Sequence, residues 1–259
     1  LLAGPTPRTI LIDAGLSIKA TRRHLEERGI QLESVTDLLL THLDADHYNP
    51  SWNRTLAAQD IAVHTHHRHS SRAISIGIPG SQVHWFDDVF TLDRFTTVEP
   101  VLMAHDALGT VAYVITHHGV RFGFATDLGR VGSDLTRAFV NLDGLAIESN
   151  YDRASQLASH RPAFLKARIM GGGGHLSNEQ SLEAVITIAE RSHLQQICLL
   201  HLSRECNCPK VIEDLWRRRA PHLAHRMVIS QRGTPTQWLE VSAPKALGDH
   251  RLIGSGGVV

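Results

Sequence analysis

The stretch 41-THLDADHY-48 places two histidines and two aspartates within seven residues, directly after the apolar run 38-LLL-40. Imidazole and carboxylate side chains together are a ligand set suited to Zn, Mn or Fe. Ligands at alternate positions can diverge toward two ions, and an adjacent Asp-His pair can reach the second ion from one tight turn. The simpler alternative is an Asp/His-rich turn that only caps the next helix. The four candidate ligands are His42, Asp44, Asp46 and His47.

Further histidines and aspartates follow other predicted strands, at the point where each strand ends. They are Asp13, His105, Asp106, Asp127 and His201. Because strand ends of an α/β sheet meet at one edge, where ligands bind in such folds, we expect these side chains to converge. The spacing therefore predicts a dinuclear site, in which ions about 3.5–4 Å apart activate a bridging water. Taken singly, His105 and His201 could instead be hydrogen-bonded rim histidines.

Outward from this stretch, predicted strands and helices alternate along the whole chain. The strands are expected at 9–13, 35–42, 61–65, 82–86, 97–104, 110–127 (a hairpin turning at 118–119), 144–149, 195–203, 226–230 and 236–241. The helices are expected at 17–28, from about 50, 153–170, 177–192 and 209–219. Helix caps support several of them, since Ser177 with Gln180 forms a capping-box pattern and Pro209 can open a helix. Interleaved elements without an internal linker predict one α/β domain over residues 1–242, with helices outside. We expect residues 243–259 to form an extended or loosely ordered tail.

Composition limits the classes of function. The chain has 259 residues, and its 26 Lys+Arg balance its 26 Asp+Glu, so no overall charge favours nucleic acid or a membrane. Three cysteines, without a signal peptide or a long apolar run, predict a cytoplasmic protein without a disulfide framework. The chain opens on Leu1 rather than Met, and we expect the native protein to begin further upstream.

Two other clusters look metal-like but have simpler interpretations. The run 64-HTHHRH-69 lies outside the series of strand ends, and we expect it to decorate a helix start. Cys206 and Cys208 form a C-x-C without a partner pair, which disfavours a structural zinc site.

The order of these motifs resembles the metallo-β-lactamase superfamily. A D-x-G segment is followed by T-H-x-[HD]-x-D-H, a strand-end His, a strand-end Asp and a late His. Within that superfamily, the chain resembles the WalJ/YycJ-type branch over about residues 9–242. The blocks that carry this closer resemblance are 105-HDA-107, 124-FATDLG-129, 148-ESNYD-152, 174-GHLSNEQ-180 and 200-LHLSRECN-207.

The resemblance implies an αββα sandwich with two central mixed sheets and two divalent metal ions at one edge. It assigns His42, Asp44 and His105 to the first ion. It assigns Asp46, His47 and His201 to the second, with Asp127 bridging and Asp13 steadying the loop from behind. Substrate would meet two blocks, one with Glu148, Asn150 and Asp152, the other with His175 and Ser177. The implied activity is exonuclease-like hydrolysis of phosphodiester bonds in single-stranded DNA or RNA.

One position departs from the usual pattern of the superfamily, which has His where this chain has Asp44. A carboxylate adds a hard oxygen and a negative charge to the first site. By ligand softness, this change should shift metal preference from zinc toward manganese or iron.

The expected mechanism uses a metal-activated water that is oriented by Asp46. His175 follows the flexible run 171-GGGG-174, and we expect it to donate a proton or a hydrogen bond to the substrate; the simpler alternative is a turn histidine whose side chain is satisfied by the backbone. The helix opening at Ser177 could offer backbone N–H groups to a phosphate. Arg204, just beyond His201, could pair with a phosphate or remain solvated.

Other functions fit the same ligand set. A small-molecule hydrolase acting on esters, lactones or thioesters is the first alternative, because neutral charge and few aromatic residues do not favour a long nucleic-acid track. A non-catalytic metal-binding protein is the second. A mononuclear iron enzyme also stays open, because an empty first site would leave an Asp/His set. A basic rim would favour the nuclease, and an enclosed apolar pocket the small-molecule enzyme. The sequence does not predict an oligomeric state.

Overall fold

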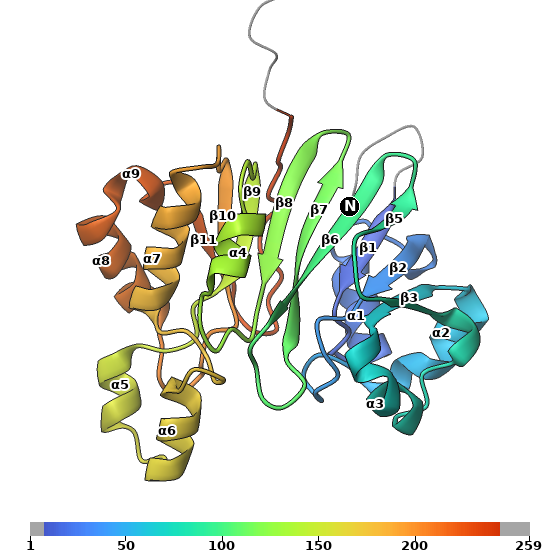
Figure 1. The fold of residues 1–259 in the computed structure, drawn as a ribbon, viewed down its shortest axis with the longest axis horizontal. Coiled ribbons are helices and arrows are strands. Elements are labelled where there is room, and N and C mark those ends of the chain that lie inside the picture. Colours follow the sequence, from blue (N-terminus) through green and yellow to red (C-terminus); the bar gives the residue numbers. More distant parts are fainter. Residues whose placement is uncertain (1–7, 244–259) are drawn as a thin grey trace, which may run out of the picture.

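Two β-sheets face each other at the centre of the computed structural model, which describes residues 8–243, and helices cover both outer faces (Figure 1). The αββα sandwich that the sequence predicts is confirmed. The larger sheet is mixed, as expected, whereas the pairs of the smaller sheet are all parallel.

The smaller sheet has the strand order β1-β2-β3-β4. Its strands are β1 (Thr9–Ile12), β2 (Val35–Leu39), β3 (Ala62–His66) and β4 (Val83–Phe86). Parallel neighbours need crossover connections. Here α1 (Ile18–Glu26), α2 (Asn53–Gln59) and α3 (Ser70–Ser75) supply them. Ser17 caps α1 as predicted, because its side chain accepts a hydrogen bond from the Ala20 N–H.

The larger sheet has the strand order β11-β10-β9-β8-β7-β6-β5. An antiparallel meander comprises β5 (Phe90–Asp93), β6 (Thr96–Met103), β7 (Thr110–His117) and β8 (Val120–Ala125). Parallel pairing then adds β9 (Gly144–Glu148), β10 (Gln196–Leu200) and β11 (Met227–Ile229). The predicted hairpin turn is confirmed, since His118 and Gly119 both have the positive φ that a tight turn demands.

The outer face of the larger sheet is covered by four helices (Figure 1). They are α4 (Ser133–Ala138), α7 (Asn178–Ala189), α8 (Pro209–Arg219) and α9 (Pro221–Ala224). Apolar side chains fill all three interfaces of the sandwich. Trp216 and Leu182 belong to the core beneath these helices, Tyr113 and Phe86 to the layer between the sheets, and Trp52 to the core under α1–α3. Packing at these three interfaces fixes the relative position of the two sheets, and therefore of the loops that they carry.

Some predicted elements are wrong. The expected helix 153–170 is two helices, α5 (Arg153–Ala158) and α6 (Ala163–Met170). Proline inside a helix breaks its hydrogen bonding, and Pro162 lies directly before α6 instead. Residues 236–241 do not form a strand. Three short elements, β5, α4 and α9, were not predicted; none is long enough to show a clear hydrophobic period.

Residues 8–243 contain no helix that is long and apolar enough to cross a membrane. The predicted tail lies almost wholly outside the described residues, which end at Ala243.

Candidate metal centre

The candidate ligands lie at one edge of the sandwich, at the bottom of Figure 1, where strands from both sheets end. Asp13 follows β1, and the loop 40–48 follows β2. From the larger sheet, His105 follows β6, Asp127 follows β8 and His201 follows β10. The two sheets therefore contribute side chains to one site, as the pattern of strand ends predicts.

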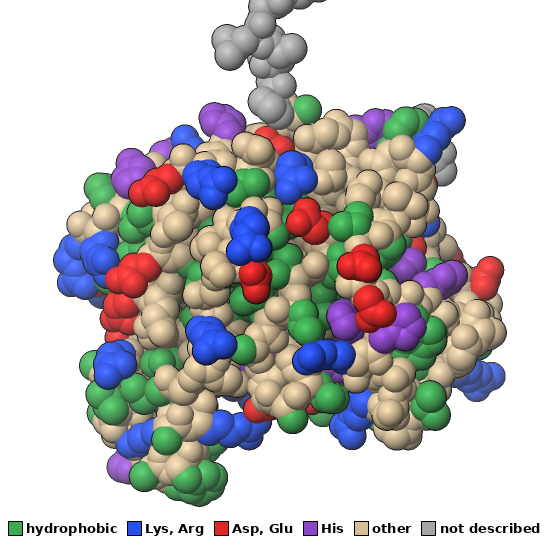
Figure 2. Space-filling model, in the orientation of Figure 1, with side chains coloured by type: hydrophobic (Ala, Val, Ile, Leu, Met, Phe, Trp, Pro, Cys, Tyr) green, Lys and Arg blue, Asp and Glu red, His purple; other side chains and the backbone are tan. Residues whose placement is uncertain are grey.

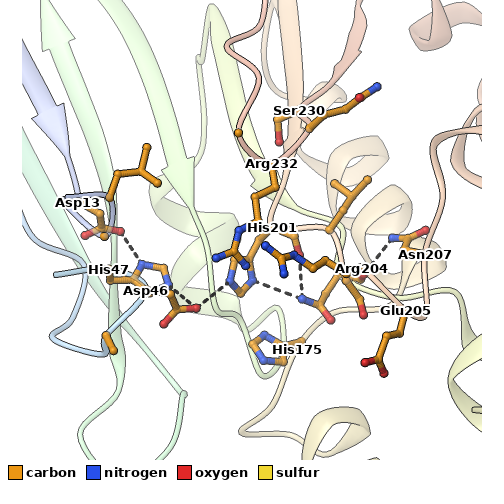
Figure 3. Close-up of a pocket in the computed structure, with 18 of the residues that line it drawn as sticks. Asp13, Asp46, His47, His175, His201, Arg204, Glu205, Asn207, Ser230 and Arg232 are labelled. Atoms are coloured by element: carbon orange, nitrogen blue, oxygen red, sulfur yellow. Dashed lines mark hydrogen bonds and ion pairs between the residues drawn. The ribbon is translucent and has the colours of Figure 1, made fainter. Parts of the chain in front are cut away.

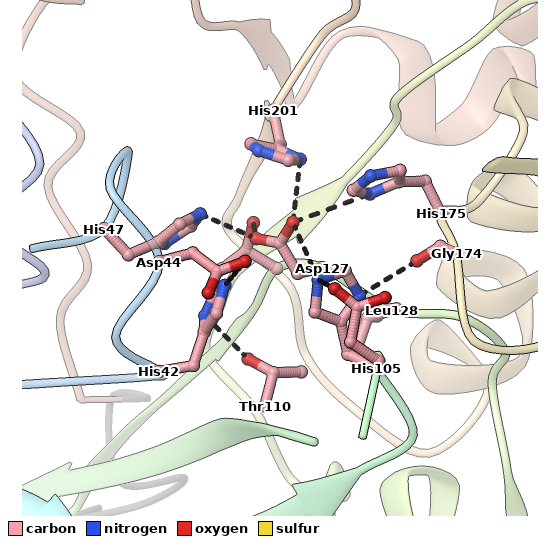
Figure 4. Close-up of polar contacts among 12 residues, drawn as sticks. His42, Asp44, His47, His105, Thr110, Asp127, Leu128, Gly174, His175 and His201 are labelled. Carbon is pink, nitrogen blue, oxygen red and sulfur yellow. Dashed lines mark hydrogen bonds and ion pairs between the residues drawn. The ribbon is translucent and has the colours of Figure 1, made fainter. Parts of the chain in front are cut away.

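Five imidazole rings surround the carboxylate of Asp127 (Figure 4). Neighbouring ring centroids are 4.1–5.6 Å apart around a closed circuit. Asp127 is 3% exposed, and its Oδ2 lies 3.0 Å from His47 Nε2. The circuit runs, in order, through His42, His47, His201, His175 and His105.

Each ring is held through Nδ1, which leaves Nε2 available for an ion. His47 Nδ1 lies 2.7 Å from Asp13 Oδ2, and His105 Nδ1 lies 3.1 Å from the Gly174 carbonyl oxygen. His42 Nδ1 lies 3.0 Å from Thr41 Oγ1. Hydrogen bonds of this kind fix the tautomer and orientation of metal-binding histidines. Asp13 therefore has the supporting position behind the loop that the resemblance implies.

Glu148 is the largest departure from the expected site. It was expected to face the substrate, but its side chain is fully buried at the end of β9. Its Oε1 lies 2.8 Å from Nδ1 of His175 and 2.8 Å from Nδ1 of His201, while the backbone N–H groups of Leu128 and Leu176 donate to Oε2. Burial opposes ionisation, but these imidazoles lower the pKa of Glu148. The carboxylate thus orients two rings from beneath the site.

The donor atoms form groups that match the two expected ligand sets. One group is His42, Asp44 and His105, and another is Asp46, His47 and His201; within each, the donor atoms lie within 4.8 Å of one another. Ligand atoms about 2.1 Å from a shared ion would lie roughly 3–3.5 Å apart. His47 Nε2 is buried and makes no hydrogen bond, although Asp127 Oδ2 is 3.0 Å away. This donor set and its orphaned nitrogen fit divalent metal ions.

Without an ion, charge in the centre is balanced by protons. Burial lowers the pKa of His47, but Asp13 and Asp127 outweigh it and raise that pKa to about 11. Burial likewise opposes the charge of His201, but Asp46 and Glu148 raise its pKa to about 10. The neighbouring His201 imidazole lowers the pKa of Asp46. These carboxylates therefore favour the protonated form of both rings, and metal binding would have to displace those protons.

The backbone is strained where the ligands leave the strands. Asp13, Asp127 and His201 have φ values of 62°, 54° and 60°, a left-handed conformation that costs energy for residues with a Cβ. Gly15 meets the loop 40–48 so closely that an added Cβ would lie 1.7 Å from the Asp46 carbonyl oxygen. The D-x-G segment is thus a backbone support for the ligand loop, which explains why glycine follows the aspartate.

An open cleft of about 1250 Å³ leads to Asp46, His47, His175 and His201 (Figure 3). Arg161, Arg204 and Arg232 also line it. Arg161 is paired with Glu205 at 3.0 Å, whereas Arg204 and Arg232 are exposed and have no ion pair with any residue in the range 8–243.

Of the expected substrate contacts, Asn150 and Arg204 line this cleft, but Asn150 Nδ2 already donates to the His201 carbonyl oxygen. The structure contradicts the expected contact of Ser177 with substrate. The residue is 4% exposed and its side chain completes the capping box of α7, so neither the hydroxyl nor the capped helix end is free to bind phosphate. Asp152 is likewise engaged, as the N-cap of α5.

A smaller hollow of about 190 Å³ lies on the other side of the centre, against His42, Asp44 and His105. His69 lines it, is 2% exposed, and has no hydrogen-bond partner for its Nε2. Burial lowers its pKa to about 4, which keeps the ring neutral. The run 64–69 was expected to stay apart from the site, yet its last histidine reaches the edge of it. The rest of the run supports the fold, as His64 bonds Asp37.

Comparison with known proteins agrees with this geometry. A family model described as a beta-lactamase superfamily domain matches residues 8–201. The chain belongs to the β-lactamase superfamily. Proteins to which it is similar include an exodeoxyribonuclease YycJ of Bacillus anthracis, 26% identical over 80% of this chain and 79% of the relative. An exodeoxyribonuclease WalJ of Streptococcus pneumoniae is 29% identical over 77% of this chain and 76% of the relative.

The superfamily fold is also that of solved structures. Zinc-bound PqqB from Methylobacterium extorquens superposes with a TM-score of 0.62 at 16% identity, over 88% of this chain and 83% of that one. Such a distant match shows the fold alone. Together, the family model and the two exodeoxyribonuclease relatives confirm the resemblance to the WalJ/YycJ-type branch of the superfamily that the sequence motifs indicate.

Proposed function

We propose that this chain is a divalent-metal-dependent exonuclease that hydrolyses phosphodiester bonds of single-stranded DNA or RNA. The observation that carries the proposal is the open cleft beside the candidate metal centre, with three arginines on its walls. At about 1250 Å³ it exceeds the roughly 300–1,000 Å³ of typical small-molecule pockets. Phosphates of a polymer supply the charge that such arginines neutralise. The exodeoxyribonuclease names of the two relatives support the same substrate class.

In this proposal, His42, Asp44 and His105 would hold one ion and Asp46, His47 and His201 would hold the other, while the carboxylate of Asp127 would lie within reach of both groups. When bound, divalent ions would activate water for attack and neutralise charge on the attacked phosphate. The ionised carboxylate of Asp46, with 64% of its side chain exposed, faces the cleft and orients the attacking water. Nδ1–H of His175 donates to Glu148, so Nε2 of His175 can donate a hydrogen bond or a proton to the phosphate oxygens when the ring carries both protons.

Cleavage of a 5′-labelled single-stranded oligonucleotide with added manganese tests the proposal. We expect wild-type protein to shorten the strand stepwise, and expect both Asp46→Ala and a chelator to abolish the reaction. Asp134→Ala is the matched control, because Asp134 is an exposed aspartate on α4 that lines neither the cleft nor the smaller hollow. Wild-type protein that binds two metal ions but leaves the strand intact would refute the nuclease; turnover of esters or lactones by that protein would favour a small-molecule hydrolase.

The metal preference follows from Asp44, which lies at the first ligand group with 57% of its side chain exposed. We propose that this carboxylate favours manganese or iron over zinc. Asp44→His replaces a hard oxygen with a borderline nitrogen. We expect the variant to bind zinc in preference to manganese at the first group, as measured by metal content after equilibration with equimolar zinc and manganese. An unchanged ratio of the two metals would contradict this assignment.

A further inference from the structure

Helices α5 and α6 form a lobe beside the metal centre, at the lower left of Figures 1 and 2. We call residues 153–170 the arm. Its composition differs from that of the chain as a whole. It has four Arg or Lys residues and no Asp or Glu, a formal charge of +4, whereas the whole chain has a net charge of zero.

Two of the four cations fix the arm to the loops that carry ligands. Arg168 pairs with Asp106 at 2.8 Å, next to His105, and Arg161 pairs with Glu205 at 3.0 Å, beyond His201. Arg153, in contrast, is exposed and has no ion pair within the described part of the chain. The arm is therefore held in place on both sides and still presents positive charge to solvent.

The arm also exposes apolar surface. Phe164 is 75% exposed, more than any other large hydrophobic side chain in residues 8–243, and Leu157 is 54% exposed. The small core of this lobe consists of other residues, Tyr151, Ile169 and Cys206, so the arm does not need Phe164 for its own packing. A solvent-exposed aromatic ring and an unpaired cation on the same two-helix lobe have the chemistry of a surface that stacks bases and contacts phosphates.

The arm continues the cleft. Arg161 and Ile169 line the cleft from the arm side, and α6 runs into the glycines 171–174, which lead directly to His175. A strand whose scissile phosphate lies near His175 would thus have the arm as its next neighbouring surface.

We propose that the arm is a docking surface for single-stranded nucleic acid, on which Phe164 stacks against a base and Arg153 contacts the backbone. The inference rests on the proposed nuclease function and adds to it a binding surface outside the metal centre. Bases of a single strand can turn a face toward Phe164, whereas bases inside a duplex are stacked on one another. The arm therefore favours single-stranded over duplex substrate.

Binding and small-substrate turnover together test the arm. Affinity for a fluorescein-labelled oligothymidylate of about 20 nucleotides, longer than one binding groove covers, is measured by anisotropy with a chelator present. Because loss of one stacking contact weakens binding by about fivefold or more, we expect Phe164→Ala to raise Kd by at least that factor. We expect Arg153→Gln to reduce the slope of log Kd against log salt by about 0.7, the contribution of one phosphate contact to a single strand.

Matched controls come from the opposite side of the molecule. Ile74→Ala removes an apolar side chain that is 74% exposed on α3, and Arg54→Gln removes an exposed cation on α2. Both should bind the oligonucleotide as wild type does. Turnover of bis(p-nitrophenyl) phosphate with manganese, a substrate too small to reach the arm, should be unchanged in all four variants.

The outcomes separate the two proposals. The arm proposal is wrong if the protein turns over the small diester and both arm variants bind the oligonucleotide normally. It is also wrong if the protein turns over the small diester and wild type does not bind the oligonucleotide. Either result would leave a metal-dependent phosphodiesterase. If wild-type protein hydrolyses neither bis(p-nitrophenyl) phosphate nor the oligonucleotide in the presence of manganese, the proposed function itself is wrong. A concentration-dependent dimer that Phe164→Ala dissociates, without loss of oligonucleotide affinity, would assign the arm to self-association instead.

Discussion

At the residue scale, the orientation of the metal-facing rings depends on groups that do not touch the ion. Glu148 is a buried carboxylate, and an isolated buried charge is costly unless it is paired and hydrogen-bonded. Two imidazoles and two backbone N–H groups surround it and offset that cost. Its position lets one residue set the tilt of His175 and His201 together.

We therefore expect Glu148→Gln to lower metal affinity by about 10–100-fold, the usual effect of losing a group that supports a metal ligand. The amide keeps the volume of the carboxylate but removes its charge, and its NH2 group donates where a carboxylate oxygen accepted two hydrogen bonds. Affinity is measured by titration of chelated protein with manganese, and circular dichroism monitors the fold. Glu190→Gln, an exposed neighbour of α7, is the control. Equal affinities in the variant and the control would show that Glu148 serves the fold alone.

Most residues of the candidate metal centre could be predicted from the sequence, because their order and their places at the ends of predicted strands can be read from it. Glu148 was misplaced because it also ends a strand, and sequence does not say whether a strand-end side chain turns toward the cleft or beneath it. The one available signal was a charge closing the buried run 144-GLAIE-148. His69 was missed because only the crossover from β3 to α3 brings it to the site.

At the scale of elements, one partly buried network connects the edges of the two sheets. Arg8, just before β1, donates to Asp37 of β2 at 2.7 Å and to Asp93 of β5 at 2.8 Å. His64 of β3 lies 2.9 Å from the other oxygen of Asp37. Burial opposes ionisation of Asp37, but the contacts with His64 and Arg8 lower its pKa below the ordinary 3.8.

Because the folded-state pKa of Asp37 is depressed, its contribution to stability is present above the ordinary pKa and is lost as pH falls through the folded value. We expect Asp37→Asn to lower the free energy of unfolding at pH 7 by about 1.5–3 kcal/mol, the value of hydrogen bonds to charged groups. The deficit should shrink in acid, below the ordinary pKa. Urea denaturation at several pH values measures this. Asp134→Asn, with 72% of its side chain exposed, should show neither effect. A deficit independent of pH would exclude the charge as its cause.

Among the elements, those with a strong period or a cap were predictable, such as α7 with its capping box and the hairpin of β7 and β8. The failures have local causes. Residues 159–162 interrupt an otherwise helical pattern, and 236-TQWLEV-241 has strand-forming residues but no neighbouring strand to pair with in the described chain. Propensity does not reveal whether a partner exists.

On the scale of the whole molecule, the two sheets are joined at opposite ends by different chemistry. The Arg8 network joins them at one end, and the candidate metal centre joins the loop after β2 to the ends of β6, β8 and β10 at the other. Ligands that bind only the folded state stabilise it, by about 2.7 kcal/mol at a concentration of 100 times Kd.

For a domain of this size, we therefore expect metal loading to raise Tm by about 5–10 °C and a chelator to reverse the change. Differential scanning calorimetry of loaded and chelated protein measures it. Asp127→Asn, which alters the carboxylate between both ligand groups, should lose most of the increase. An increase of the same size in that variant would mean that metal binds elsewhere.

The circuit of five imidazoles also has a consequence for biosynthesis. It begins at His42 and is closed by His201, so more than half of the chain must leave the ribosome between its first and last members. Domains fold as their chains emerge, and the smaller sheet can assemble long before β10 exists. We expect the nascent chain to carry only a partial ligand set for most of its synthesis. Stable metal acquisition would then be a post-translational step, governed by the metal that the cell offers at release.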